Sequence, residues 1–147
     1  MRRWWVILIG VLGLLAVVAA VIQFTGMSYA SLRDDVRAHG AHVEENGVGA
    51  QPFPRGADHR LTVNGANVDV FEYWTFIGAS LDAARISRDG STFNQGIGPL
   101  GGSAVTVDFV APPHWFHSGR VIVLYVGYDR SVMTLLGATL GPQIAGL

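Results

Sequence analysis

The hydropathy pattern begins with a continuous apolar block. Residues 4–24 (WWVILIGVLGLLAVVAAVIQF) run for 21 positions without a charge. This matches the roughly 20 residues that a helix needs to cross a hydrocarbon core about 30 Å thick. Trp4 and Trp5 at the start of the block stand where interfacial aromatic anchors lie, and Phe24 closes it. The pattern predicts a transmembrane helix that anchors the protein in the lipid bilayer.

Charge sets the expected orientation of this helix. Arg2 and Arg3 precede the block, and positive residues stay on the cytoplasmic side. We therefore expect a single-pass protein of the cell membrane, with an anchor over 1–26 and a domain over 27–147 outside the cytoplasm. The alternative is a signal peptide cleaved after Ala30, because Ser28-Tyr29-Ala30 is an acceptable small-x-small site.

Three later segments carry apolar residues at helical spacing. The last two follow residues that are good N-caps, Thr75 and Asp129. Glycine ends the first segment at Gly40, and Gly141-Pro142 ends the last. The predicted helices are Ser28–His39 (Tyr29, Leu32, Val36), Thr75–Ser87 (Ile77, Leu81, Ala84) and the stretch after Asp129 (Val132, Leu135, Leu136, Leu140).

Alternation with a period of two marks the predicted strands. Asn64-Gly65 lies between alternating apolar positions and predicts a two-residue hairpin turn. Residues 103–110 alternate again, whereas 120–126 (RVIVLYV) are apolar on both faces, as in a central strand covered on two sides. The stretch APPHWFHSGR (111–120) reads as a connection between these last two strands.

The predicted order is helix, hairpin, helix, hairpin, helix. Two successive hairpin–helix units favour an antiparallel sheet of about four strands with helices packed on one face. The expected fold class is α+β, following the N-terminal transmembrane helix.

Composition excludes several function classes. Beyond Arg2 and Arg3, eight Arg and no Lys stand against 11 acidic residues, a net charge near −3. The basic footprint of a nucleic-acid-binding domain is absent, and so is a polybasic cluster for anionic lipid. There is no cysteine, so a disulfide framework is impossible. No nucleophile–base constellation stands out in the sequence, and we expect no enzyme and no cofactor.

The five histidines raise the question of a metal site. His39 and His42, like His114 and His117, form H-x-x-H pairs, and His59 stands alone. Several imidazoles brought together would bind Zn²⁺ or Cu²⁺. Neither pair lies on a predicted regular helix, where positions i and i+3 share a face. We expect no metal site, with histidine-based metal binding kept as the alternative function.

The aromatic stretch His114-Trp115-Phe116 is the predicted partner-binding site. Exposed aromatic residues in a loop are favoured at interfaces. The competing interpretation is that His114 only bonds a backbone carbonyl and steadies the turn. A third alternative, an extracytoplasmic hydrolase, would require His114 to meet a carboxylate such as Asp108 or Asp69.

Several short motifs resemble a family of small bacterial exported, anchored or lipoprotein-like proteins without an assigned activity. The resemblance covers most of the chain after residue 31 and supports His114 but not His117, His39 or His42 as a family position. Tyr128 departs from the acidic residue of the pattern. The motifs are QPF (51–53), LTVNG (61–65), VFEY (70–73), SRDGS (87–91), APPH (111–114), GRVIVLYVG (119–127) and LGPQIAG (140–146).

These observations predict a membrane-anchored extracytoplasmic domain that works by binding or assembly. The expected partner is another membrane or envelope protein. The oligomeric state is left open.

Overall fold

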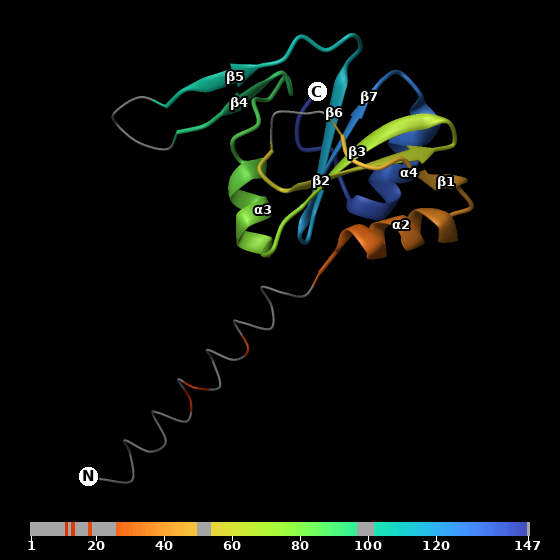
Figure 1. The fold of residues 1–147 in the computed structure, drawn as a ribbon, viewed down its shortest axis with the longest axis horizontal. Helices are drawn as coiled ribbons and strands as arrows, with labels where there is room; N and C mark the ends of the chain where they lie inside the picture. The colour runs from red at the N-terminus through yellow and green to blue at the C-terminus, as the bar shows by residue number, and fades with distance from the viewer. Residues whose placement is uncertain are drawn as a thin grey trace.

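The computed structural model describes residues 26–49, 54–96 and 102–146, together with Val11, Gly13 and Val18. Between residues 26 and 146, the described elements are a main sheet, a short β-ribbon and the helices α2, α3 and α4 (Figure 1). In chain order they are α2 (Tyr29–Ala38), β1 (Val43–Glu45), β2 (Ala57–Val63), β3 (Ala66–Glu72), α3 (Phe76–Ala83), β4 (Thr92–Asn94), β5 (Ala104–Thr106), β6 (Pro113–Ser118), β7 (Val121–Val126) and α4 (Arg130–Leu140).

The main sheet has five antiparallel strands in the order β1-β2-β3-β7-β6, and β4 pairs with β5 in the ribbon. The hairpin predicted from Asn64-Gly65 is confirmed, because both residues have positive φ (52° and 88°) and Val63 lies opposite Ala66. The prediction of a central strand over 120–126 is also confirmed, since β7 runs between β3 and β6.

Both faces of the main sheet are covered. Val121, Val123 and Tyr125 of β7 join a core with α2 and α4, whereas Ile122 and Leu124 join a second core with α3 and the ribbon. The expectation that helices pack on one face is therefore wrong. The double coverage explains why β7 is apolar at every position, because both of its faces leave water.

The helices α2, α3 and α4 each begin at a side-chain cap. Ser28, Thr75 and Asp129 accept hydrogen bonds from the amides of Ser31, Gly78 and Ser131, respectively, which satisfies amides that lack a partner within the helix. The predicted caps Thr75 and Asp129 are thus confirmed. The buried residues are Leu32 and Val36 in α2, Ala79 and Asp82 in α3, and Val132, Leu136 and Leu140 in α4.

The second predicted hairpin is wrong. Residues 113–118, expected to be a loop, form β6, which pairs with β7 through a tight turn at Gly119-Arg120. Residues 104–106 belong instead to the ribbon. Pro113 made this stretch read as a loop, but proline fits the edge strand of a sheet, where its missing N–H costs no ladder hydrogen bond.

The predicted fold class also requires a correction at the membrane helix. No helix in the described part of the chain is long and apolar enough to cross a membrane. The longest of α2, α3 and α4 has 11 residues, about 17 Å at 1.5 Å per residue, against a hydrocarbon core of about 30 Å. The predicted single-pass transmembrane helix therefore has no counterpart among the described residues. Trp4, Trp5 and Phe24 lie outside the described residues.

Candidate binding site

The aromatic residues predicted to bind a partner are part of the core. Trp115 is 0% exposed, stacks against Phe71 and donates from Nε1 to the Gly90 carbonyl at 2.8 Å. Phe116, its neighbour in β6, is buried in the core on the opposite face. The exposed loop on which their predicted binding role depended is therefore replaced by a buried strand.

His114 holds the C-terminal segment against the sheet. Its Nε2 lies 3.0 Å from the Gly127 carbonyl, and its Nδ1 lies 3.2 Å from Oε1 of Gln143. Gln143 in turn donates from Nε2 to the carbonyls of Ala145 and Gly146, each at 2.8 Å. The predicted hydrogen bond between His114 and a backbone carbonyl is confirmed, but His114 lies in strand β6 and not in the turn that it was expected to steady.

Among the described residues, His114 meets neither Asp69 nor Asp108, the carboxylates proposed to pair with it in a hydrolase. His114 stacks on Tyr125, which packs in the core on the α2–α4 face. Asp69 lies opposite Leu124 in the neighbouring strand, and Leu124 belongs to the core on the other face. His114 and Asp69 are therefore on opposite faces of the sheet, and His114 meets an amide and a carbonyl in place of a carboxylate.

The histidine pairs do not converge. His114 and His117 are three residues apart in one strand, so their side chains point to opposite faces. His39 contacts the Asp35 carbonyl at 2.8 Å, and His42 contacts Glu44 at 3.0 Å. In the described part of the chain no three His, Cys, Asp or Glu side chains are grouped to hold a metal ion.

His117 occupies an apolar site under α3. Its ring stacks on Phe76 at a centroid distance of 6.0 Å. Its Nε2 is buried without a hydrogen-bond partner among the described residues. Burial lowers the pKa of His117 below its ordinary value of 6.5, and a backbone hydrogen bond at Gly119 offsets part of this shift. The folded protein therefore favours the neutral imidazole.

This environment predicts a stability that depends on pH. Because the folded pKa of His117 lies below the unfolded one, the unfolded chain binds more protons in the interval between them. The contribution is fully present above about pH 6.5 and is lost as the pH falls towards the folded pKa. His117→Phe should reduce the loss of unfolding free energy between pH 7 and 5, measured by urea denaturation. The exposed His42→Gln variant is the control, and equal slopes for wild type and His117→Phe would contradict the prediction.

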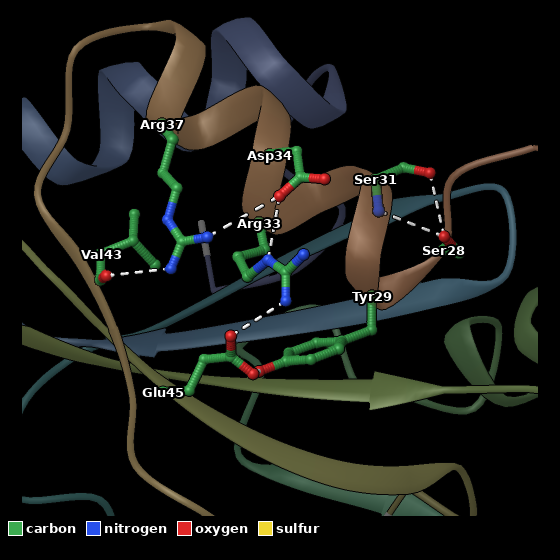
Figure 2. A network of polar contacts seen from close by, with 8 residues as sticks. All are labelled: Ser28, Tyr29, Ser31, Arg33, Asp34, Arg37, Val43 and Glu45. Carbon is green, nitrogen blue, oxygen red and sulfur yellow. Dashed lines mark hydrogen bonds and ion pairs between the residues drawn. The ribbon is translucent and has the colours of Figure 1, made fainter.

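A polar network joins α2 to the edge strand β1 (Figure 2). Glu45 accepts from Nη1 of Arg33 at 2.9 Å and from the Tyr29 hydroxyl at 3.1 Å. The hydrogen bond from Arg33, followed by that from Tyr29, lowers the pKa of Glu45. Arg37 donates to the Val43 carbonyl at 3.3 Å. These contacts fix α2 on β1 and occupy one carbonyl on the outer side of this strand.

A second polar group lies at the start of the same helix. Glu72 accepts from the Tyr29 amide at 3.1 Å, and Nη2 of Arg120 lies 3.6 Å from the same oxygen. His59 stacks on Tyr29 with a centroid distance of 4.1 Å and has Nε2 3.9 Å from Glu72. Because Glu72 is occupied by a helix amide and a guanidinium, this arrangement caps α2 and joins it to the sheet.

The most buried carboxylate belongs to α3. Asp82 is 1% exposed and accepts from Tyr73 at 2.8 Å, from Arg55 at 2.7 Å and from Arg85 at 2.8 Å. Burial, and then the hydrogen bond to Asp82, raises the pKa of Tyr73 well above its usual range. Both carboxylate oxygens are occupied by donors of this protein. The cluster therefore joins α3 to the segment before β2 and leaves no open ligand position on Asp82.

Two open cavities lie beside residues 107–110, the segment that leaves β5, and share it as a common wall. The first, about 350 Å³, opens over β2, β3 and β7. The second, about 340 Å³, opens towards Ser91 and the start of β6. Both have the size of small-ligand or side-chain pockets. We call the two cavities together the groove. Beyond the shared segment, the first is lined by Arg60, Asn67, Asp69, Leu124 and Val126, and the second by Ser91, Ala111, Pro112, Pro113 and Tyr128.

The walls of the groove combine apolar and polar groups. Val110 is 99% exposed and Tyr128 is 75% exposed, so two large apolar side chains stand in water at its rim. At the base of the first cavity, Nε of Arg60 bonds Asp69 at 2.7 Å. The hydrogen bond to Asp69 is the largest cause that raises the pKa of Arg60, and burial opposes it. Asp108 adds an exposed carboxylate.

Comparison of the chain with protein-family models, with curated proteins and with solved structures gives no match. The groove is therefore interpreted from its own residues. Its polar base has a signal in the sequence, because the Asn64-Gly65 turn sets the register that places Arg60 opposite Asp69. No comparable sequence pattern predicts that Val110 and Tyr128 are exposed beside the groove.

Proposed function

We propose that this protein is a binding module that holds an extended segment of a partner protein in the groove beside residues 107–110. The observation that carries the proposal is the pair of cavities on either side of this segment, with Val110 and Tyr128 exposed at their rim. Exposed apolar side chains beside a polar cavity are typical of interaction sites. A location outside the cytoplasm and a partner in the cell envelope stay predictions from the sequence.

The geometry favours a segment of protein over a compact small molecule. The groove is open and residues 107–110 divide it, so a ligand that fills both cavities must extend along or across this segment. An extended chain can do so, because its alternate side chains lie about 6–7 Å apart on one face. Tyr128 and Val110 then cover apolar side chains of the partner. The favourable free energy of binding comes from removing both apolar surfaces from water.

A display selection tests this function. The 147-residue chain is immobilised and challenged with a phage library of random dodecapeptides. Enriched peptides are then measured by isothermal titration against wild type, the groove variant Val110→Asp/Tyr128→Asp, and the control Leu81→Asp, which alters an exposed apolar residue of α3. We expect at least a tenfold loss of affinity for the groove variant only. Equal binding to all three proteins, or failure of any peptide to enrich, would contradict the proposal.

A further inference from the structure

The outer edge of β5 has backbone groups without a partner in the described chain. The amide of Gln95 donates to Ser103, and the amide of Val107 donates to Ser91. In an antiparallel pair the bonding direction alternates along the strand. The N–H and C=O groups of Ala104 and Thr106 consequently point away from β4, and among the described residues no hydrogen bond is formed to them.

Both edge strands of the main sheet, unlike β5, have features that hinder the addition of another strand. At β6, Pro113 has no N–H, and Trp115 exchanges hydrogen bonds with the C-terminal segment through Ala145 and Ile144 at 3.1 and 2.8 Å. At the opposite edge, β1 has only three residues, and Arg37 occupies the Val43 carbonyl. Short strands, proline and covering segments are the usual protection against unwanted strand pairing. The strand β5 is as short as β1, with three residues, but in the described chain neither a proline nor a covering segment occupies its outer edge.

The open edge continues into the groove. After Thr106 the chain continues into residues 107–110, which line the first cavity over β2, β3 and β7. Figure 1 shows the connection from β5 passing over the top of the domain to the start of β6. A strand added to β5 and continued along residues 107–110 would reach the cavity that Arg60 and Asp69 line.

The charge in this cavity selects the side chain that the added strand would present. Arg60, Asp69 and Asp108 are its ionisable lining groups, and together they carry a net charge of −1. Arg60 is already paired with Asp69, which leaves Asp108 as the unbalanced carboxylate. Asp58 contributes a further negative charge near Arg60. A cation is favoured there, whereas an anion would meet an excess of carboxylates.

We propose that the partner segment pairs with the outer edge of β5 as an additional β-strand and places a Lys or Arg side chain in the first cavity, beside Asp69 and Asp108. This inference rests on the proposed function and specifies its ligand. Main-chain hydrogen bonds to Ala104 and Thr106 supply affinity, and the cavity supplies specificity, as in other cases of strand addition to an open edge.

The test uses the peptides enriched in the display selection. We expect them to share a basic residue. Replacing that residue by Ala should weaken binding to the wild-type chain about fivefold, which is the change in affinity expected for the loss of one partly exposed ion pair. The same replacement should have little effect on binding to Asp108→Asn. The control Asp35→Asn alters an exposed carboxylate of α2 and should behave like wild type. N-methylation of alternate peptide amides should weaken binding about tenfold at the positions that face β5 and leave the positions between them unchanged.

The outcomes separate the inference from the function on which it rests. Peptides that lose binding to Val110→Asp/Tyr128→Asp, but tolerate N-methylation at every position or enrich an acidic residue, would overturn the inference and leave the binding function in place. Peptides indifferent to Val110→Asp/Tyr128→Asp would overturn both. A dimer of the free chain in sedimentation equilibrium, dissociated by N-methylated β5-sequence peptide, would assign the edge to a second copy and would also overturn the inference.

Discussion

Replacing Trp115 by Ala is expected to lower the free energy of unfolding by about 3–5 kcal/mol, the range for removing a large buried aromatic residue. The indole is fully buried, packs against Phe71, and satisfies the Gly90 carbonyl. Its loss leaves a cavity between β6 and the segment before β4, together with an unpaired buried carbonyl. Chemical denaturation monitored by circular dichroism measures the change.

Two further substitutions show whether this effect arises from the core. Trp115→Phe keeps much of the packing and loses the hydrogen bond, so it should cost clearly less than Trp115→Ala. Val110→Ala, at a fully exposed position, should leave stability within about 0.5 kcal/mol of wild type. A stable, folded Trp115→Ala variant with altered binding only would show that the indole acts at a surface, contrary to its burial.

Replacing Asp82 by Asn is expected to cost about 3–5 kcal/mol, because breaking a buried ion pair leaves an uncompensated charge. Arg85 is the group affected most, since its side chain is 15% exposed and its Nε already lacks a hydrogen-bond partner among the described residues. Arg55 is largely exposed and can return to water. The unfolding free energy of Asp82→Asn, compared with that of the exposed control Asp35→Asn, measures the cost.

A double-mutant cycle separates the two guanidinium groups. In wild type, Arg85→Gln should be strongly destabilising, and in the Asp82→Asn background it should be nearly neutral, because the charge that needed a partner is gone. Arg55→Gln should have a small effect in both backgrounds, since solvent screens an exposed pair. Additive costs for Asp82 and Arg85 would show that the carboxylate does not act through this contact.

Local turn and cap chemistry predicted much of the fold. Asn64-Gly65 gave the first hairpin with its register, and Thr75 and Asp129 gave two helix starts, because each signal is complete within a few neighbouring residues. Burial on both faces of β7 was likewise readable from its unbroken apolar run. These features require no information about distant segments.

The errors occur where long-range contacts decide the structure. Ile77 and Leu81, whose spacing indicated α3, are 46% and 49% exposed, while Asp82 of the same helix is buried by Arg55 and Arg85. Hydropathy alone would have predicted that Ile77 and Leu81 are buried and that Asp82 is exposed. Pro113 similarly favoured a loop, because its place at the protected edge of a sheet depends on β7 and the C-terminal segment.

The candidate site was only partly readable for the same reason. Asp69 and Asp108 were singled out as carboxylates that could meet His114, but the pleat of the sheet places Asp69 on the face opposite His114. Its actual partner, Arg60, follows from the hairpin register. The exposure of Val110 depends on how the connection between β5 and β6 crosses the sheet, and no local pattern encodes that path.

The two ends of the β6–β7 hairpin have different neighbours. Gly119 has φ of 55°, and a Cβ there would overlap the Met27 backbone, while the Arg120 amide donates to the Met27 carbonyl at 2.9 Å. Met27 thus contacts the sheet at this turn, whereas the second cavity opens beside Pro113 and Tyr128, at the other end of β6 and β7. Six strand residues, about 20 Å, separate the two ends. The Met27 contact and the second cavity therefore lie at opposite ends of the β6–β7 hairpin, so the segment that we propose to bind beside Pro113 does not compete for space with Gly26 and Met27.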